Sequence, residues 1–295
     1  MIYYALIEKL FAGGICELKE RTDKGYRPSG YGDELSEAGI NRFIRTVGVF
    51  RVETRSTVTS TNTELRQIAE RGAPEGCVLA AGEQTAGKGR IGRSFHSPAG
   101  SGAYFSLLLR PGRYAANAAL ITSAAAVAAA KAIADVTGIE TGIKWVNDLF
   151  TGGKKVGGIL TETVSGMQNG VIESAILGIG INIIRPDEGF PGTLEEIAGA
   201  LYQKETGVDS VRSRLIAATL DIFWEYYIDL ENRDFLEDYR ARSIVLGKDI
   251  SVISGNREQP ARAVAIDDDC GLVVRYESGD IETLRSGEVS VRGIG

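Results

Sequence analysis

The sequence predicts an α+β protein in which helices cover a mixed β-sheet, with a smaller β-domain at the C-terminus. Alternating and apolar strand patterns recur between residues 46 and 184. Longer helical patterns occupy residues 115–137 and 208–240. From Lys248 onward only short alternating strands follow, separated by turns, which is typical of a small antiparallel barrel. We therefore expect two folded units with a boundary near Ser243.

The composition is that of an ordinary globular chain. Its 295 residues are 43% hydrophobic and 24% charged, and the formal net charge is -6. This acidic balance argues against wholesale coating of nucleic acid, so a local basic segment is expected to serve a small anion. Three separated cysteines and one histidine exclude the usual zinc sites. With no signal peptide pattern, the sequence predicts a cytoplasmic protein without a tightly bound metal.

The first residues resemble part of a winged helix-turn-helix. Residues 1–11 have helical spacing, and residues 15–28 read as two short strands around a turn at 22–25. The helices that should precede a recognition helix are missing, because the chain begins inside it. We predict a winged-helix remnant at 1–28, a linker at 29–45 and no specific DNA binding.

Residues 46–137 are expected to hold three strands and two helices. The strands are placed at 46–58, 77–81 and 103–109, and the helices between Thr61 and Gly72 and at 115–137. A Ser or Thr followed three residues later by Glu64 reads as a capping box for the first helix, and capping alone would explain its Ser/Thr/Asn cluster. The second helix is mostly alanine and too weakly apolar to span a bilayer, so it is expected in the core.

Residues 143–240 continue the sheet and then become helical. Strands are expected at 143–149, 154–162 and 171–184. The first of them runs into a turn, and a hairpin at 151–153 joins it to the second. A polar loop follows at 185–192, and helical segments are expected near 194–203 and 208–240.

The most unusual stretch of the sequence is a glycine loop within residues 83–98. Its three glycines and three cations alternate, and they are Gly87, Lys88, Gly89, Arg90, Gly92 and Arg93. Glycines let the backbone bend and approach a ligand closely, while each bend presents a positive charge. The pattern predicts a loop that closes on an anion.

Other glycine loops fit this stretch poorly. The spacing satisfies G-x-G-x-x-G, but a dinucleotide loop must open into a helix and meet an acid about 20 residues later. Here a turn and a second strand follow, and residues 110–113 contain no acid. No His-Arg-Asp of a protein kinase is present, and Gly87-Lys88 is followed by Gly89, not by the Ser or Thr of a Walker A loop. A solvated basic loop stays the simple alternative.

Four separated segments carry unusual polar residues beside glycines. They are Ser60-Thr61-Asn62, residues 84–93, Lys144-Trp145-Val146-Asn147-Asp148 and Lys155-Val156-Gly157-Gly158. With the Gly-Ile-Gly-Ile-Asn strand and residues 286–292, they resemble the biotin-protein ligases of the bifunctional ligase/repressor type. The resemblance runs from about residue 35 to residue 292. It implies a catalytic domain of the class II synthetase-like, lipoate/biotin ligase fold at 46–242 and an SH3-like barrel at 243–295.

The resemblance implies an ATP-dependent ligase that acts in two steps. The carboxylate of biotin attacks the α-phosphate of ATP, which gives biotinyl-5'-AMP and pyrophosphate. A lysine of the biotin carboxyl carrier domain of acetyl-CoA carboxylase then attacks the mixed anhydride. Neither step needs an enzyme nucleophile, which fits a sequence without a Ser-His or Cys-His arrangement. Positioning and charge stabilisation are needed instead, and Arg90 and Lys155 are the implied catalytic residues.

The resemblance also assigns binding residues. For biotin they are Ser60, Thr61, Asn62, Gln84, Lys88, Gly89, Arg90, Lys155, Gly157 and Gly158. For ATP and the adenylate they are Gly87, Lys88, Gly89, Arg90, Arg93, Phe95, Asn147 and Asn182. Asn147 and Asp148 are natural oxygen ligands for Mg²⁺, although turn stabilisation explains them equally well. Without the family context, Lys155 could be an edge-strand lysine that deters aggregation.

Two other activities compete with biotin ligation. A biotin-responsive DNA-binding repressor is disfavoured by the incomplete winged helix. A lipoate ligase of the same fold is disfavoured by the Gly-Lys-Gly-Arg loop and the C-terminal barrel, since fold alone would not separate the two. The expected partners are biotin, ATP and the carrier domain, and a homodimer is possible because relatives pair through exposed sheet edges.

Overall fold

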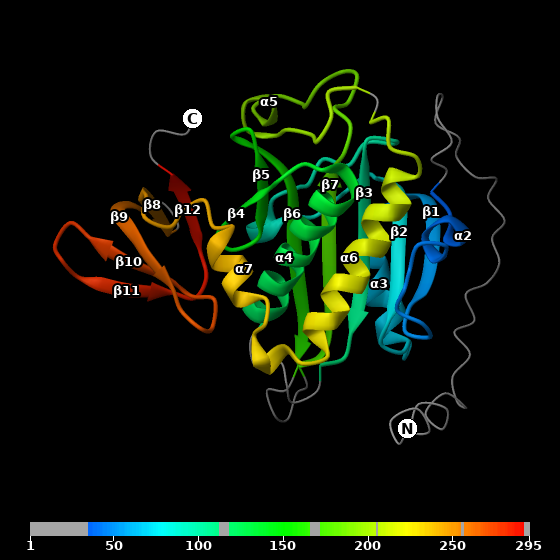
Figure 1. The fold of residues 1–295 in the computed structure, drawn as a ribbon, viewed down its shortest axis with the longest axis horizontal. Helices are drawn as coiled ribbons and strands as arrows, with labels where there is room; N and C mark the ends of the chain where they lie inside the picture. The colour runs from blue at the N-terminus through cyan, green and yellow to red at the C-terminus, as the bar shows by residue number, and fades with distance from the viewer. Residues whose placement is uncertain (1–34, 112–117, 166–171, 205, 255–256, 292–295) are drawn as a thin grey trace.

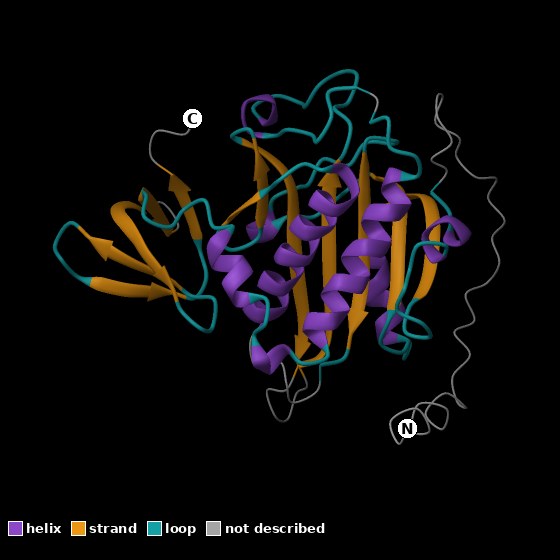
Figure 2. Ribbon diagram, viewed as in Figure 1, coloured by secondary structure: helices purple, strands orange, loops and turns teal. Residues whose placement is uncertain are grey.

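The structure is a computed structural model that describes residues 35–111, 118–165, 172–204, 206–254 and 257–291. Seven strands form one large sheet, and five form a smaller sheet beside it (Figure 1). Helices α4 and α6 lie on one face of the large sheet and α3 lies on the other (Figure 2). The predicted α+β class is confirmed. The predicted winged-helix remnant lies outside the described residues, and the domain limits stay predictions.

The large sheet has the strand order β1-β2-β3-β7-β6-β5-β4. Its strands are β1 (Arg51–Val58), β2 (Cys77–Gln84), β3 (Gly102–Leu109), β4 (Gly142–Lys144), β5 (Asp148–Thr151), β6 (Lys154–Ser165) and β7 (Ile172–Asn182). β1 and β2 are parallel, because the chain crosses between them through α3 (Thr61–Glu70), and the other pairs are antiparallel. The long apolar β7 occupies the middle of the sheet, between β3 and β6.

An alanine-rich helix fills the core on one face of this sheet. The helices, besides α3, are α2 (Glu37–Asn41), α4 (Ala118–Thr137), α5 (Leu194–Ile197), α6 (Val211–Tyr227) and α7 (Leu236–Ala241). The helix α4 packs on α6, α7 and β6. Among the described helices α4 alone is long and apolar enough to cross a membrane, yet 72% of its apolar window is buried inside the fold. The predicted core helix is therefore confirmed.

The smaller sheet is antiparallel throughout, in the order β11-β10-β9-β8-β12. Its strands are β8 (Asp249–Ser254), β9 (Arg257–Ile266), β10 (Leu272–Tyr276), β11 (Ile281–Leu284) and β12 (Glu288–Val291). Trp145 Nε1 donates to the Cys270 carbonyl at 2.9 Å, and Arg240 Nε donates to the Ile266 carbonyl at 2.9 Å. These bonds join the small sheet to the β4–β5 turn and to α7. A small antiparallel C-terminal unit was predicted, and the five-stranded antiparallel sheet is consistent with a small barrel.

Several predicted elements were wrong in their extent, and the strand expected at 46–58 begins only at Arg51. The helix expected at 208–240 breaks after Tyr227, where a short 3-10 turn ends in Arg233 with a left-handed φ of 57°. The helix expected at 194–203 stops at Ile197, because residue 198 pairs with residue 155 of β6 and residue 202 pairs with residue 184, just after β7. The strand expected at 143–149 splits into β4 and β5 around a turn. The early end of the 194–203 helix reflects pairing with residues distant in sequence, which local pattern does not contain.

The buried carboxylate of Asp221 fixes the segment before β1 to α6. Asp221 is 2% exposed and accepts the backbone N–H groups of Arg45 and Thr46, each at 2.9 Å. We predict that Asp221→Ala lowers the free energy of unfolding by about 2 to 3 kcal/mol, because two donors lose a charged acceptor. Urea unfolding measures the loss. Asp135→Ala, at an exposed position of α4, is the control; an equal loss in both variants would contradict the prediction.

Candidate active site

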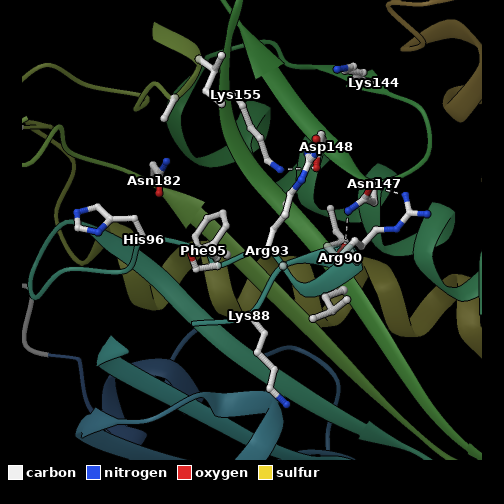
Figure 3. A pocket seen from close by; sticks show the side chains of 18 of the residues that line it. Lys88, Arg90, Arg93, Phe95, His96, Lys144, Asn147, Asp148, Lys155 and Asn182 are labelled. Atoms are coloured by element: carbon white, nitrogen blue, oxygen red, sulfur yellow. Dashed lines mark hydrogen bonds and ion pairs between the residues drawn. The ribbon is translucent and has the colours of Figure 1, made fainter. Parts of the chain in front are cut away.

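A cavity of about 390 Å³ lies between the glycine loop, strands β6 and β7, and residues 287–290 at the edge of the small sheet. Nearly all the predicted site residues line it (Figure 3). They are Ser60, Thr61, Asn62, Gln84, Lys88, Gly89, Arg90, Arg93, Phe95, Asn147, Asp148, Lys155, Gly158 and Asn182. Only Gly87 and Gly157 of the predicted set are outside the lining. Segments more than 200 residues apart in sequence thus meet at one cavity.

The start of α3 and the end of β2 form a polar floor. Thr61 donates to Gln84 Oε1 from its backbone N at 2.9 Å and from its hydroxyl at 3.1 Å, and Gln84 Nε2 donates to Ser97 Oγ at 2.9 Å. Ser60 is the N-cap residue of α3, but its side chain makes no capping bond, so the capping box was wrong in this respect. A buried side chain at the cavity wall is therefore a better description of Ser60 than a cap.

A residue that the sequence analysis missed completes this floor. Ser106 is fully buried in β3, and its hydroxyl donates to Asn62 Oδ1 at 2.6 Å and lies 2.7 Å from Thr61 Oγ1. Asn62 Nδ2 in turn donates to Glu162 Oε2 at 2.8 Å. A lone serine in the apolar strand 103–109 was the signal that could have found it. These bonds fix the amide group of Asn62 at the cavity.

Two glycines of β7 allow side chains to lie directly on the strand. A Cβ added to Gly178 would stand 2.1 Å from Asn62 Oδ1, and one added to Gly180 would stand 2.6 Å from Cε1 of Phe95. Glycine in a strand often marks such a close approach. The sequence analysis quoted this strand as part of the motif but assigned no site role to either glycine.

The glycine loop is a closed hairpin. Phe95 N donates to the Gly87 carbonyl at 2.8 Å, and Gly89 N donates to the Arg93 carbonyl at 2.7 Å. At its tip Ile91 is 74% exposed and has a left-handed φ of 54°. A Cβ on Gly87 would lie 2.4 Å from the Phe95 carbonyl, so Gly87 shapes the hairpin from outside the cavity lining.

Gly157 also acts through the backbone. A Cβ on Gly157 would lie 2.9 Å from the Gly180 carbonyl and 3.2 Å from Leu149 Cδ1. Its place in the sheet is therefore explained by close packing between β5, β6 and β7, whereas Gly158 faces the cavity.

Lys155, Arg90 and Lys88 each have an identified polar partner. Lys155 Nζ lies 2.6 Å from Asp148 Oδ1, while Arg90 donates to Asn147 Oδ1 at 3.0 Å and to the Gly287 carbonyl at 3.3 Å. Lys88 points away from this group toward Glu162, with 3.8 Å between charged atoms (Figure 3).

Arg93 is held by the small sheet. Its two terminal nitrogens donate to the two carboxylate oxygens of Glu288 at 2.8 and 2.5 Å. The resulting bidentate pair links the glycine loop to the start of β12. Glu288 was not among the predicted site residues.

Lys144 is a further cation of the cavity lining that was quoted in the motif without a role. Burial lowers the pKa of its ammonium group, against the opposing charges of Asp148 and Glu288. Lys155 and Arg93 also lower the pKa of Lys144, because like charges disfavour a further positive charge.

The far wall of the cavity is aromatic and amide in character. Phe95 meets Tyr104 edge to face with ring centres 6.4 Å apart, and His96 meets Phe190 in the same manner at 6.4 Å. Asn182 Nδ2 donates to the Gly199 carbonyl at 3.0 Å, which orients its amide. This end of the cavity can accept a flat ring.

Within the described residues, no group of three or more His, Cys, Asp or Glu side chains could hold a metal ion. The candidate ligand Asn147 is already engaged at both ends, since its Nδ2 donates to the Ile159 carbonyl at 2.7 Å while Oδ1 accepts Arg90. Asp148 offers a carboxylate beside Lys155. Of the two predicted metal ligands, Asp148 is therefore the one whose oxygens are better placed to bind a cation.

Comparison with known proteins agrees with this geometry. The family model described as Biotin/lipoate A/B protein ligase family matches residues 54–182, and that described as Biotin protein ligase C terminal domain matches residues 245–292. The fold and the two matched segments thus define the class of biotin and lipoate protein ligases.

Individual relatives narrow the class. The bifunctional ligase/repressor BirA of Bacillus subtilis is 32% identical over 290 residues, which span 97% of this chain and 87% of that protein. A biotin--[acetyl-CoA-carboxylase] ligase of Paracoccus denitrificans is 35% identical over 75% of this chain and 92% of its own. The biotin protein ligase of Aquifex aeolicus, solved with biotin and ATP, aligns with a TM-score of 0.69 at 28% identity, covering 82% of this chain and 98% of its own. The chain belongs to the biotin protein ligase family.

The lowered pKa of Lys144 makes stability depend on pH. Between the lowered native pKa of Lys144 and its ordinary value, the unfolded state binds more protons than the native state. Stability should therefore rise with pH across that window, and we predict that Lys144→Met removes this contribution. Urea unfolding at a series of alkaline pH values measures it. Lys248→Met, at an exposed position, is the control, and parallel pH curves for wild type and Lys144→Met would refute the prediction.

Proposed function

We propose that the protein activates biotin with ATP as biotinyl-5'-AMP and transfers the biotinyl group to a lysine of a biotin carboxyl carrier domain. One observation carries the proposal: a single cavity joins a hydrogen-bonding amide floor to a cluster of cations. The floor suits a neutral polar ring, and the cations suit a carboxylate beside a triphosphate. Lipoate has no ureido group, so the amide floor favours biotin over lipoate.

In this proposal, biotin lies along the floor. Its ureido ring meets Ser60, Thr61, Asn62 and Gln84, where each donor and acceptor can be satisfied. Gly158 lets the ring lie against β6, and the chain extends toward Lys155 and the loop residues Lys88, Gly89 and Arg90. Gly157 supports this strand through its packing rather than by contact with the ligand.

ATP occupies the remaining part of the cavity. Phe95 and Asn182 lie at the end that suits the adenine ring, and Gly89, Arg90, Arg93 and Asn147 lie near the phosphates. A biotin carboxylate oxygen attacks the α-phosphorus, and pyrophosphate leaves with the electron pair of the broken bond. Arg90 and Lys155 offset the repulsion between the two anions and the charge that develops between them. Fixed donors of this kind need no rearrangement during the reaction.

Magnesium is expected to arrive with ATP and to supply charge neutralisation at the phosphates. Asp148 is the better of the two candidate ligands, and Asn147 is the weaker because its amide is committed to Arg90 and to Ile159. One carboxylate with substrate phosphates is a usual coordination for this ion.

The partner expected for the second step is the carrier domain of acetyl-CoA carboxylase, which the name of the Paracoccus denitrificans relative suggests. A homodimer and a cytoplasmic location stay predictions. The name of the Bacillus subtilis relative also includes a repressor function, and the winged-helix remnant predicted here lies outside the described residues.

Single-turnover formation of biotinyl-AMP from biotin and Mg-ATP tests the proposal. We expect Arg90→Ala and Lys155→Ala each to slow adenylate formation about 10²- to 10³-fold, because each removes a fixed donor at the developing charge. Lys248→Ala, at an exposed position directly before β8 and outside the cavity lining, is the control. Adenylate formed from lipoate and not from biotin would sink the proposal.

The close approach of Asn62 to Gly178 gives a separate test of the biotin subsite. We predict that Gly178→Ala weakens biotin binding by at least about tenfold, because the new Cβ would displace the Asn62 amide. Titration calorimetry measures the affinity, and binding of Mg-ATP alone is the internal control. Unchanged biotin affinity would place the ureido ring elsewhere.

A further inference from the structure

The ion pair between Arg93 and Glu288 suggests a role for the small sheet in the ATP step. We propose that Glu288 is a positioning residue. It forms an ion pair with Arg93 before ATP binds, and Arg93 leaves this pair to bind a phosphate of ATP. This inference rests on the proposed function, because it concerns the triphosphate end of the same cavity. It assigns a nucleotide-linked exchange of partners to a residue of β12.

The geometry of the pair is the first argument. Both terminal nitrogens of Arg93 donate to separate oxygens of one carboxylate, at 2.8 and 2.5 Å. Guanidinium makes the same two-pronged contact with phosphate as with carboxylate. Glu288 therefore presents to Arg93 the arrangement of oxygens that a phosphate group would present.

The position of Glu288 is the second argument. Glu288 lines the cavity at the first residue of β12, directly after Gly287, whose carbonyl accepts Arg90 at 3.3 Å. The negative charge of Glu288 also acts on Lys144, whose pKa it raises. The carboxylate of Glu288 thus stands among the cations to which the proposed function assigns the triphosphate.

The exposure of the pair shows that exchange is feasible. The side chain of Arg93 is 67% exposed and that of Glu288 is 28% exposed. Ion pairs in contact with water are weak, because solvent screens both charges. A triphosphate carries more negative charge than one carboxylate, so it competes successfully for Arg93 and repels Glu288 from the same place.

The exchange has two consequences. Before ATP binds, the pair keeps the glycine loop against the small sheet and keeps Arg93 near its working position. After ATP binds, the start of β12 loses one of its contacts with the loop. ATP binding and the attachment of the small sheet are then linked, so each affects the other by the same free energy.

Substitution of Glu288 by glutamine tests the exchange. Glutamine keeps the shape but loses the charge, so Glu288→Gln should bind the complex of magnesium with a non-hydrolysable ATP analogue about two- to fivefold more tightly. Biotin affinity should not change. Titration calorimetry measures both ligands, and Glu277→Gln, an exposed change in the turn directly after β10, is the control.

Hydrogen exchange provides a second measurement, whose result would not depend on ATP if Glu288 had a purely structural role. In the wild type, the analogue should speed exchange of the backbone amides of residues 287–289, and in Glu288→Gln these amides should exchange quickly with or without it. Weaker analogue binding by Glu288→Gln, or equal loss for the analogue and biotin, would overturn the exchange. Unchanged affinity for both ligands would overturn it as well.

The two proposals fail in different ways. If the wild type binds the analogue but forms no biotinyl-AMP, the proposed function fails while the exchange at Arg93 can still be observed. If biotinyl-AMP forms normally and Glu288→Gln leaves analogue binding unchanged, the exchange fails alone.

Discussion

Several positive charges converge on one cavity, and the rest of the site depends on how the fold holds them apart. Arg90 is held by Asn147 and Gly287, Lys155 by Asp148, and Arg93 by the carboxylate of the small sheet. Without these acceptors the cations would repel one another and turn toward solvent. Because they are held in advance, they can meet an incoming anion with little rearrangement.

The acceptors come from parts of the chain that local structure does not connect. Asn147 and Asp148 stand at the turn between β4 and β5, and this turn is fixed from outside the large sheet. The Tyr239 hydroxyl donates to the Val146 carbonyl at 2.9 Å, and Trp145 donates to the Cys270 carbonyl at 2.9 Å. The helix α7 and the small sheet therefore brace this turn, and residues 287–290 of the small-sheet edge also line the cavity.

Much of the site could be predicted because its residue types are unusual at their positions in the sequence. Alternating glycines and cations, or Asn-Asp after an apolar strand, have few structural explanations, so the sequence singled out the loop and the turn, and both line the cavity. Ser106 and Gly178 were missed as site residues, since a serine or a glycine within a strand is unremarkable until its neighbour across the sheet is known. Glu288 was missed for the same reason, because its interaction is with Arg93, almost 200 residues away in the sequence.

The sequence by itself determined the order of strands and helices, the buried alanine helix and the chemistry of the loop, because periodicity and residue type are local properties. Only the tertiary structure decided where the C-terminal helices break, which glycines face the cavity and which partner each cation takes. Those features depend on contacts between segments that are distant in sequence, and only the packing of the sheets and helices brings such segments within hydrogen-bonding distance.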